Sequence, residues 1–256
     1  MSHRDLASLA SLAREAAEAC LAAVHDRGVD WSATGLRRGQ HRGDVLADAV
    51  ALEHLSVPWL NVYSEESGLL DRGAALTAIV DPIDGSTNAS RGLYPWASSI
   101  AIVDDQGPLV AVVALGRTGS VYEATRGGGV RLDGRRVRVS GASSVRGKVI
   151  ACNGTPRAWL GWGQLRAFGS AASELAFVAE GSIDGLVDFS EGLAVWDIAA
   201  GVLLVHEAGG VVSTVEGERP RLDLAAKRQR ILAGATRDLV DELRKAWADR
   251  ALRARW

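Results

Sequence analysis

The sequence contains only two cysteines, Cys20 and Cys152, which lie far apart and have neither a CxxC spacing nor a histidine partner. This scarcity excludes a disulfide-stapled scaffold and a cysteine-based zinc site. Both thiols are therefore expected to be buried in the core. Unbonded cysteines are typical of the cytoplasm, which is the compartment that we expect for the protein.

An excess of one charge is also missing, because 29 Lys and Arg residues accompany 31 Asp and Glu residues, for a formal net charge of −2. Nucleic-acid binders normally carry a clear basic excess, so no nucleic-acid partner is expected. The longest apolar runs, such as residues 110–115, are far too short to cross a bilayer. Residues 1–20 include Asp5, Glu15 and Glu18, unlike a signal or transit peptide. No membrane association is expected.

Apolar residues make up 47% of the 256 residues, which is enough for a sizeable core. Their spacing alternates between helix-like and strand-like along the chain, and this predicts an α/β protein. We expect an N-terminal half over residues 1–140 and a second α/β half over residues 141–256. The expected helices are 6–27, ended by Gly28, then 44–55, 171–179, 197–207 and 236–255. The expected strands are 59–63, 76–80, 98–103, 109–115, 148–152 and 185–189, with a hairpin over 121–140.

Two of the predicted strands are followed by carboxylates. Glu65 and Glu66 come after the first strand. Asp81 directly follows the strand at 76–80, and Asp84 comes three residues later, after a proline. Clustered carboxylates repel one another, so a folded cluster needs a compensating cation. Oxygen ligands of this kind suit Mg²⁺ or Mn²⁺. Each motif alone is more simply a turn or a solvated strand end, but their succession on consecutive strands favours a metal site.

Gly85, Ser86 and Thr87 follow this cluster and predict a tight turn that opens a helix and exposes amide groups. An anion-binding turn beside a metal site indicates phosphoryl chemistry. Far downstream, Asp197 opens another helix and is either a helix cap or a distant carboxylate that completes the metal site. The glycines at 127–129 predict a turn and not a phosphate loop, because no Lys-Ser/Thr pair follows them.

These motifs occur in one order: Glu65-Glu66, Asp81-Pro-Ile-Asp-Gly-Ser-Thr-Asn88, Arg166-Ala-Phe-Gly-Ser-Ala-Ala172, Trp196-Asp-Ile-Ala-Ala-Gly201 and Glu207-Ala-Gly-Gly210. Order and content resemble the inositol monophosphatase family, the Mg²⁺-dependent and typically lithium-sensitive sugar phosphatases. The similarity extends over roughly residues 5–235. It implies a layered αβαβα sugar-phosphatase fold, a metal site between the two halves, and a homodimer.

Position by position, the resemblance implies roles for the acids. Glu65, Asp81 and the backbone carbonyl of Ile83 would hold the metal ion that activates water, which makes Glu65 a catalytic residue as well. Asp81, Asp84 and Asp197 would hold a second ion near the leaving oxygen. Two or three Mg²⁺ ions, or Mn²⁺ in their place, are the implied cofactors.

The remaining roles concern water and substrate. Asp44 and the hydroxyl of Ser86 would orient the attacking water, as the second pair of catalytic residues. The implied contacts to the substrate are made by Gly85, Ser86 and Thr87 at the phosphate and by Gly169, Ser170, Ala171, Glu191 and Asp197 at the alcohol.

Three departures from the family pattern concern the substrate. An aromatic residue usually follows the asparagine of the motif, and Ala89 stands there instead. The inositol enzymes place a glutamate seven residues before Asp197; here that position is Ser190, and Glu191 is one residue later. The lysine that often reaches the site from the first loop has no match within residues 37–40.

The resemblance thus implies hydrolysis of a phosphomonoester on a small polyol or sugar, with inositol monophosphate as the leading candidate. Alternative substrates are fructose 1,6-bisphosphate, histidinol phosphate, 3′-phosphoadenosine 5′-phosphate and a secondary-metabolite phosphate. A different class is a non-catalytic, metal-bound interaction module. Retention of all the expected carboxylates argues against that class, because such a module could lose them freely.

Overall fold

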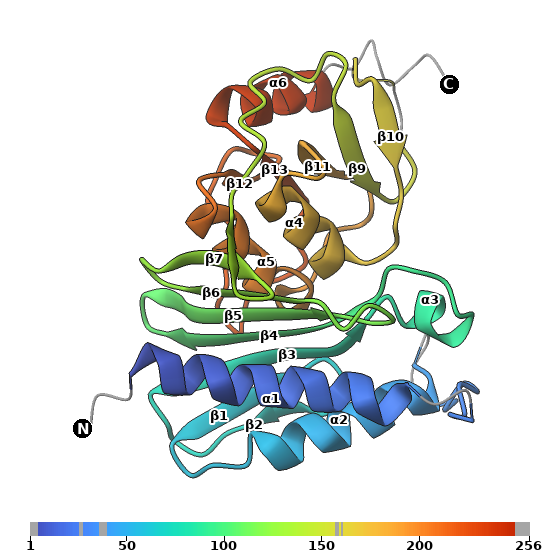
Figure 1. The fold of residues 1–256 in the computed structure, drawn as a ribbon, viewed down its shortest axis with the longest axis vertical. Helices are drawn as coiled ribbons and strands as arrows, with labels where there is room; N and C mark the ends of the chain where they lie inside the picture. The colour runs from blue at the N-terminus through green and yellow to red at the C-terminus, as the bar shows by residue number, and fades with distance from the viewer. Residues whose placement is uncertain (1–4, 26–27, 36–39, 157–158, 160, 249–256) are drawn as a thin grey trace.

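Helices and sheets alternate in five layers in the computed structural model, which describes residues 5–25, 28–35, 40–156, 159 and 161–248 (Figure 1). Helices α1 (Leu6–Val24) and α2 (Arg42–His54) cover one face of the first sheet. Helices α4 (Ala171–Glu180) and α5 (Val195–Glu207) lie between the two sheets, and α6 (Arg237–Ala248) covers the second sheet. The predicted αβαβα architecture is confirmed.

The first sheet has eight strands in the order β2-β1-β3-β4-β5-β6-β7-β8. Strands β1 and β3 run parallel, with Ser64 opposite Val80, and all other neighbours are antiparallel. The carboxyl ends of β1 and β3 therefore meet at one edge of the sheet. The strands are β1 (Leu60–Ser64), β2 (Gly68–Leu70), β3 (Leu76–Asp84), β4 (Ala97–Asp104), β5 (Gly107–Leu115), β6 (Val121–Thr125), β7 (Gly129–Leu132) and β8 (Arg135–Val137).

The second sheet has five strands in the order β10-β9-β11-β13-β12. Strands β10, β9 and β11 are parallel, so β10 leads toward the start of α4 and β11 toward the start of α5 from the same edge. This edge brings both helix N-termini toward the first sheet. The strands are β9 (Val149–Asn153), β10 (Gln164–Arg166), β11 (Gly185–Asp188), β12 (Val211–Thr214) and β13 (Ile231–Gly234).

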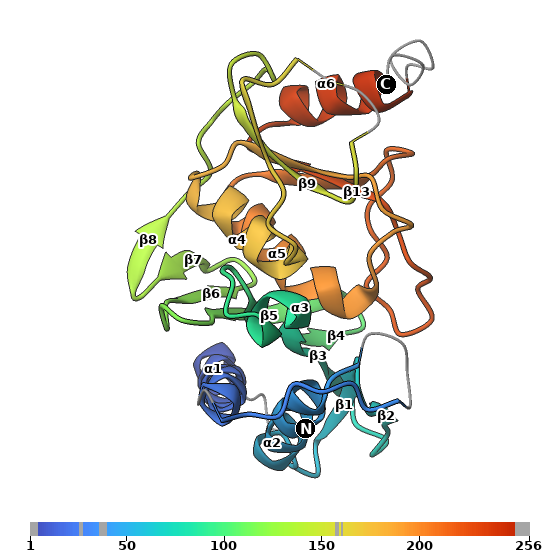
Figure 2. The ribbon, with the colours of Figure 1, turned by 90° about the vertical axis from the view of Figure 1, so that its right-hand side faces the viewer.

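Small residues allow the layers to approach closely. Helix α5 carries Gly201, where an added Cβ would lie 2.4 Å from Leu175 Cδ1 of α4. Figures 1 and 2 show the two helices side by side between the sheets. Cys20 and Cys152 are buried and form no disulfide, as predicted.

The glycine turn at 127–129 is confirmed as a turn between β6 and β7. The amides of Gly127 and Gly129 donate to the two carboxylate oxygens of Glu207, at 2.7 and 2.9 Å. These amides thus bind an internal carboxylate and tie the hairpin to the end of α5. Within the predicted hairpin region, a turn at Asp133 and Gly134 joins β7 to β8, and both residues have positive φ.

Several predicted boundaries were wrong. Helix α1 ends at Val24 with His25 as its cap, before Gly28, and α2 begins at Arg42, which makes Asp44 its third residue. Strand β3 continues through the proline to Asp84 with an irregular register, because Asp84 still pairs with β4. The short strands β2, β10, β12 and β13 have too few residues for a clear periodicity and were not predicted. The predicted last helix continues over residues 249–255, which lie outside the described residues.

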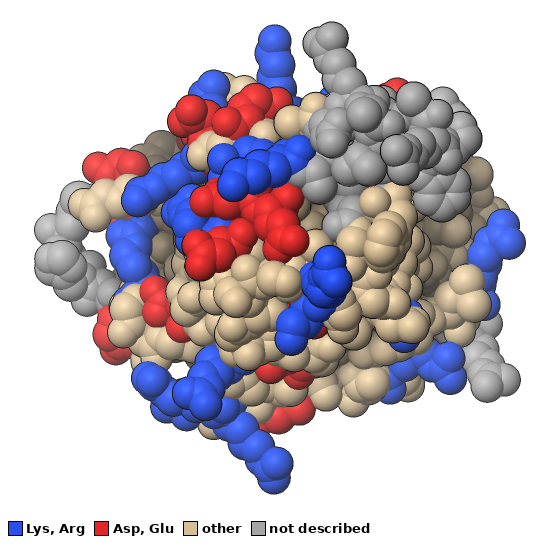
Figure 3. All heavy atoms as spheres, turned by 90° about the horizontal axis from the view of Figure 1, so that it is seen from above, with Lys and Arg blue, Asp and Glu red and all other residues tan. Residues whose placement is uncertain are grey.

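Helix α6 carries both signs of charge, with Arg237, Arg244 and Lys245 beside Asp238 and Asp241. Figure 3 looks onto this end of the molecule and shows blue and red side chains interspersed. Arg244 and Asp241 form an ion pair within the helix. Within the described residues, every helix is too short or too polar to cross a bilayer.

Candidate active site

Three carboxylates from different parts of the chain meet where α5 packs against the first sheet. Glu65 follows the last residue of β1, Asp81 lies in β3, and Asp197 is the third residue of α5. One oxygen of each lies within 4.8 Å of the other two. The packing of α5 on β3 therefore brings the late carboxylate to the pair that leaves the first sheet.

Asp81 is the buried centre of this group. Burial raises the pKa of Asp81 well above its usual value, and the negative charges of Glu65, Asp84, Asp197 and Asp44 raise it further. Its Oδ1 is buried and has no hydrogen-bond partner among the described residues. A buried carboxylate oxygen without a donor, surrounded by other carboxylates, fits a hard divalent cation such as Mg²⁺.

Asp44 and Asp197 are held in the same way, each as the third residue of a helix. Asp44 Oδ2 accepts the amide of His41 at 2.8 Å, and Asp197 Oδ2 accepts the amide of Ala194 at 2.6 Å. Burial, with smaller effects of neighbouring acids, raises the pKa of Asp44 to about 6 and that of Asp197 to about 7. A carboxylate has two oxygens, so Asp197 can cap its helix with one and belong to the acid cluster with the other. Asp44 Oδ1 is likewise buried without a partner among the described residues.

Asp84 connects the end of β3 to the start of α4. Its Oδ2 accepts the Ser170 hydroxyl and the Ala172 amide, both at 2.7 Å. Asp84 is not among the three acids whose oxygens lie within 4.8 Å, although its charge raises the pKa of both Asp81 and Asp197. The structure thus joins a predicted metal ligand directly to the predicted substrate residue Ser170.

The glycine turn next to Asp84 requires glycine for two reasons. Gly85 has a φ of +85°, and an added Cβ would lie 3.1 Å from both Gly169 O and Ser170 Cβ. Ser86 and Thr87 then open the short helix α3 (Ser86–Ser90), as the sequence predicted. The turn therefore lies against the loop before α4, with Ala171 as the first residue of that helix.

Asn88 links α3 to the second half of the chain. Its Nδ2 donates to Pro95 O and to Phe168 O, each at 2.7 Å. Ile83, whose carbonyl is a predicted ligand, is buried in β3. These contacts hold the predicted phosphate side and the predicted alcohol side of the site against each other.

The predicted substrate residue Glu191 is exposed in the loop after β11, and among the described residues no hydrogen bond or ion pair joins it to the acids. Ser190, which occupies the glutamate position of the inositol enzymes, serves a local turn: its hydroxyl accepts the Gly192 amide at 3.0 Å. In the first loop, Gln40 donates a hydrogen bond to Glu66 and accepts one from Thr34 at 2.7 Å. Sequence reasoning assigned no role to Gln40, because its contact depends on two distant loops meeting.

Glu174 of α4 was not predicted to have a role either, because nothing in the sequence distinguishes it from an ordinary helical residue. It is fully buried, its Oε1 accepts the Phe168 amide at 2.9 Å, and it therefore holds the loop that carries Gly169 and Ser170. Burial, as the largest cause, raises the pKa of Glu174 from 4.5 to about 8. The folded protein therefore keeps this proton at pH values where the unfolded chain has lost it.

Replacing Glu174 by glutamine is expected to flatten the pH dependence of stability. The wild-type contribution of this proton is fully present below the unfolded pKa of 4.5 and is lost as pH rises through about 8. Glutamine keeps the acceptor for Phe168 without the ionisation, so the variant should gain relative stability on the order of 1–3 kcal/mol between these limits. Urea unfolding at several pH values measures this difference, with exposed Glu53→Gln as the control. A parallel loss of stability in the variant would contradict the assignment.

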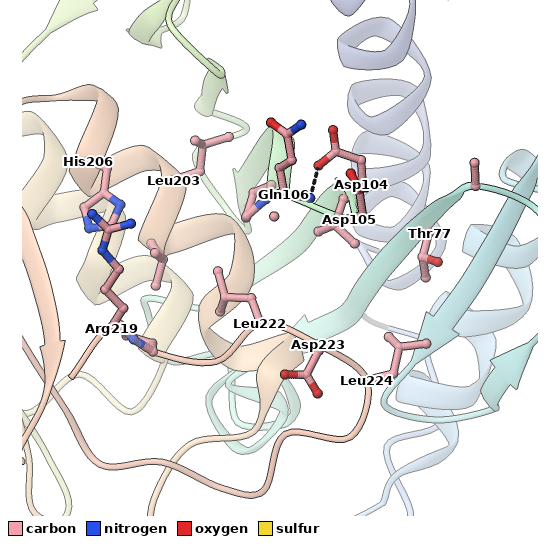
Figure 4. Close-up of a pocket in the computed structure, with 16 residues that line it drawn as sticks. Thr77, Asp104, Asp105, Gln106, Leu203, His206, Arg219, Leu222, Asp223 and Leu224 are labelled. Carbon is pink, nitrogen blue, oxygen red and sulfur yellow. Dashed lines mark hydrogen bonds between the residues drawn. The ribbon is translucent and has the colours of Figure 1, made fainter. Parts of the chain in front are cut away.

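A hollow of about 590 Å³ is shown in Figure 4, and its lining includes none of Glu65, Asp81 and Asp197. Its lining includes Thr77 at the start of β3, Asp105 in the β4–β5 turn, and Leu203 and His206 in the later part of α5. The hollow lies at the start of β3 and the end of α5, whereas the acids lie toward the end of β3 and at the start of α5. The hollow is therefore separate from the candidate site.

Comparisons with known proteins show which family the chain resembles. The sequence profile of the inositol monophosphatase family matches residues 52–255. The chain is 36% identical over 211 residues to a Thermococcus kodakarensis protein named fructose-1,6-bisphosphatase/inositol-1-monophosphatase, which covers 80% of this chain and 82% of that protein. It is 34% identical over 223 residues to Nus factor SuhB of Escherichia coli (strain K12), which covers 79% and 83%. The crystal structure of extragenic suppressor protein suhB from Bartonella henselae is similar with a TM-score of 0.83 and 27% identity, covering 95% of this chain and 99% of that one.

Proposed function

The chain belongs to the inositol monophosphatase family and is a phosphatase, and we propose that it hydrolyses the phosphomonoester of a small polyol or sugar with Mg²⁺ as cofactor. The observation that carries this proposal is the meeting of Glu65, Asp81 and Asp197 beside the glycine turn at Gly85. Carboxylates that fit a divalent cation, next to amides that can bind an anion, are the two parts that phosphoryl transfer requires.

The metal ligands in this proposal are Glu65, Asp81 and the carbonyl of Ile83 for one ion, and Asp81, Asp84 and Asp197 for another. Two or three Mg²⁺ ions are proposed, with Mn²⁺ as an alternative. Bound Mg²⁺ supplies Lewis-acid stabilisation of negative charge and lowers the pKa of water.

The protein's own groups would bind the phosphate and move the proton. The amides of Gly85 and Ser86, with Thr87 beside them, bind the phosphate oxygens at the start of α3. The Ser86 hydroxyl orients the attacking water. Asp44 accepts the proton that this water loses, and the buried Oδ1 of Asp44 has no hydrogen-bond donor among the described residues. A raised pKa suits a carboxylate that takes up a proton during the reaction.

The alcohol side of the substrate would be bordered by Gly169, Ser170, Ala171 and Asp197, with Glu191 as a further proposed contact from an exposed loop. Inositol monophosphate is the first substrate proposed, and fructose 1,6-bisphosphate is supported by the name of the Thermococcus kodakarensis relative. Histidinol phosphate, 3′-phosphoadenosine 5′-phosphate and a secondary-metabolite phosphate complete the set. A division of the chain at residue 140, a homodimer, a cytoplasmic location and inhibition by Li⁺ remain predictions from the sequence.

Phosphate release from this set of substrates tests the proposal. We expect release from at least one sugar or polyol phosphate with Mg²⁺, loss of release when a chelator removes the ion, and inhibition by Li⁺. The measurement is inorganic phosphate against time at fixed enzyme concentration. Binding of Mg²⁺ without release from any substrate would favour the non-catalytic interaction module.

A further inference from the structure

The side chain of Arg228 lies at the outer edge of the acid cluster. Its Nη1 is 3.8 Å from Asp197 Oδ2, and its side chain is 57% exposed, compared with 14% for Asp197. The guanidinium group thus lies between solvent and a carboxylate that is proposed to bind metal. Arg228 comes from the segment before β13, far from the motifs that predicted the site.

The backbone holds Arg228 in this place. Gln229 and Leu193 form an antiparallel bridge, with N–H···O distances of 2.9 and 2.8 Å in the two directions. Gly192 beside the bridge has a φ of +105°, and an added Cβ would lie 3.0 Å from Gln229 N and 3.1 Å from Arg228 C. The glycine therefore allows the arginine segment to pack against the loop that leads into α5.

The guanidinium group retains donors for another partner. Its Nη1 donates to Gly192 O at 3.0 Å, which is its single hydrogen bond among the described residues. The 3.8 Å separation from Asp197 is too long for a hydrogen bond. Arginine has five N–H donors in a fork that matches a phosphate or a carboxylate, so several remain available for an anion.

A cation at this position opposes the binding of Mg²⁺ to Asp197 through repulsion of like charges. An additional anion on the same side would offset this repulsion, and the free donors of Arg228 are available to bind it. We propose that Arg228 determines substrate specificity by binding a second anionic group, a phosphate or a carboxylate, on the alcohol portion of the substrate. This inference rests on the proposed function and ranks its substrates, because a neutral polyol offers Arg228 no anion.

The test compares kcat/KM for three substrates: inositol 1-phosphate, whose alcohol is neutral, fructose 1,6-bisphosphate, which carries a second phosphate, and 6-phosphogluconate, which carries a carboxylate. Wild-type protein should prefer one of the two doubly anionic substrates, and the preferred one identifies the second group. Arg228→Ala should lower kcat/KM for that substrate by about 10- to 100-fold, mainly through KM, and leave inositol 1-phosphate little changed. Arg228→Lys should lose less, because it keeps the charge but not the fork.

The matched control is Lys227→Ala, which removes one positive charge from the neighbouring exposed position and should leave all three substrates unchanged. Equal wild-type activity on neutral and doubly anionic substrates would overturn the inference, as would an equal loss on all substrates in Arg228→Ala. Both outcomes leave the phosphatase assignment intact. A wild-type protein that releases phosphate from none of the substrates would overturn the proposed function and this inference with it.

Discussion

Asp81→Asn is expected to lower kcat/KM by roughly 10³-fold or more and at the same time to stabilise the metal-free protein. The loss of activity follows because Asp81 is proposed to contact both ions, and several kcal/mol of transition-state stabilisation correspond to at least this factor. The gain in stability follows from burial. Asp81 is 1% exposed, and the charges of Glu65 and Asp84 raise the pKa of its carboxyl together with desolvation. Removing the ionisation removes that repulsion.

Urea unfolding in the presence of a chelator measures the second effect, which should be a higher free energy of unfolding for the variant at neutral pH. Added Mg²⁺ should then raise the melting temperature of wild type but not of the variant, because only wild type binds the ion tightly. Asp105→Asn, an exposed acid at the far end of the sheet, is the control and should change neither property. Wild-type activity in Asp81→Asn would disprove the metal assignment.

Asp44→Asn should lower kcat by about 10²- to 10³-fold, because general-base catalysis has roughly that value. The asparagine side chain still offers an oxygen to the His41 amide, so the helix cap is kept. It has no carboxylate to accept the proton from the water held by Ser86. The measurements are kcat at saturating substrate and the melting temperature of each protein.

Asp44→Ala separates the two roles of this side chain. It should lose activity to a similar degree and, in addition, lose about 1 kcal/mol of stability, because the cap of α2 is removed. If both variants lost stability equally and Asp44→Asn kept full activity, Asp44 would be a structural cap only. Comparison of the pair therefore distinguishes catalysis from capping at one position.

The elements that carry the acids could be predicted because their signals are local. Asp81 directly follows the predicted strand 76–80, Asp84 follows around a proline, and Gly85 adopts a positive φ, all within ten residues. Such patterns depend on the short-range geometry of strands and turns. Short edge strands such as β10 and β12 depend on neighbours far away in the sequence, and they escaped prediction for that reason.

Asp197 shows the limit of sequence reasoning more clearly. The sequence left a helix cap and a metal ligand as alternatives, and the structure gives one carboxylate oxygen to the cap and places the side chain in the acid cluster. Glu191 shows the opposite case, since a sequence shift of one residue made it a candidate while the structure leaves it exposed on a loop. The choice between such alternatives depends on which side of a loop faces the site.

The sequence by itself determined which oxygen ligands leave which strand and helix ends, and hence the chemical class of the site. Only the tertiary structure decided how Asp84 joins Ser170, how Glu174 supports the loop before α4, and that Arg228 stands beside Asp197. The physical reason is that backbone patterns act over a few residues, whereas charges interact through space. The nearly balanced charges therefore concealed a local excess of acid, beside which packing placed the side chain of Arg228.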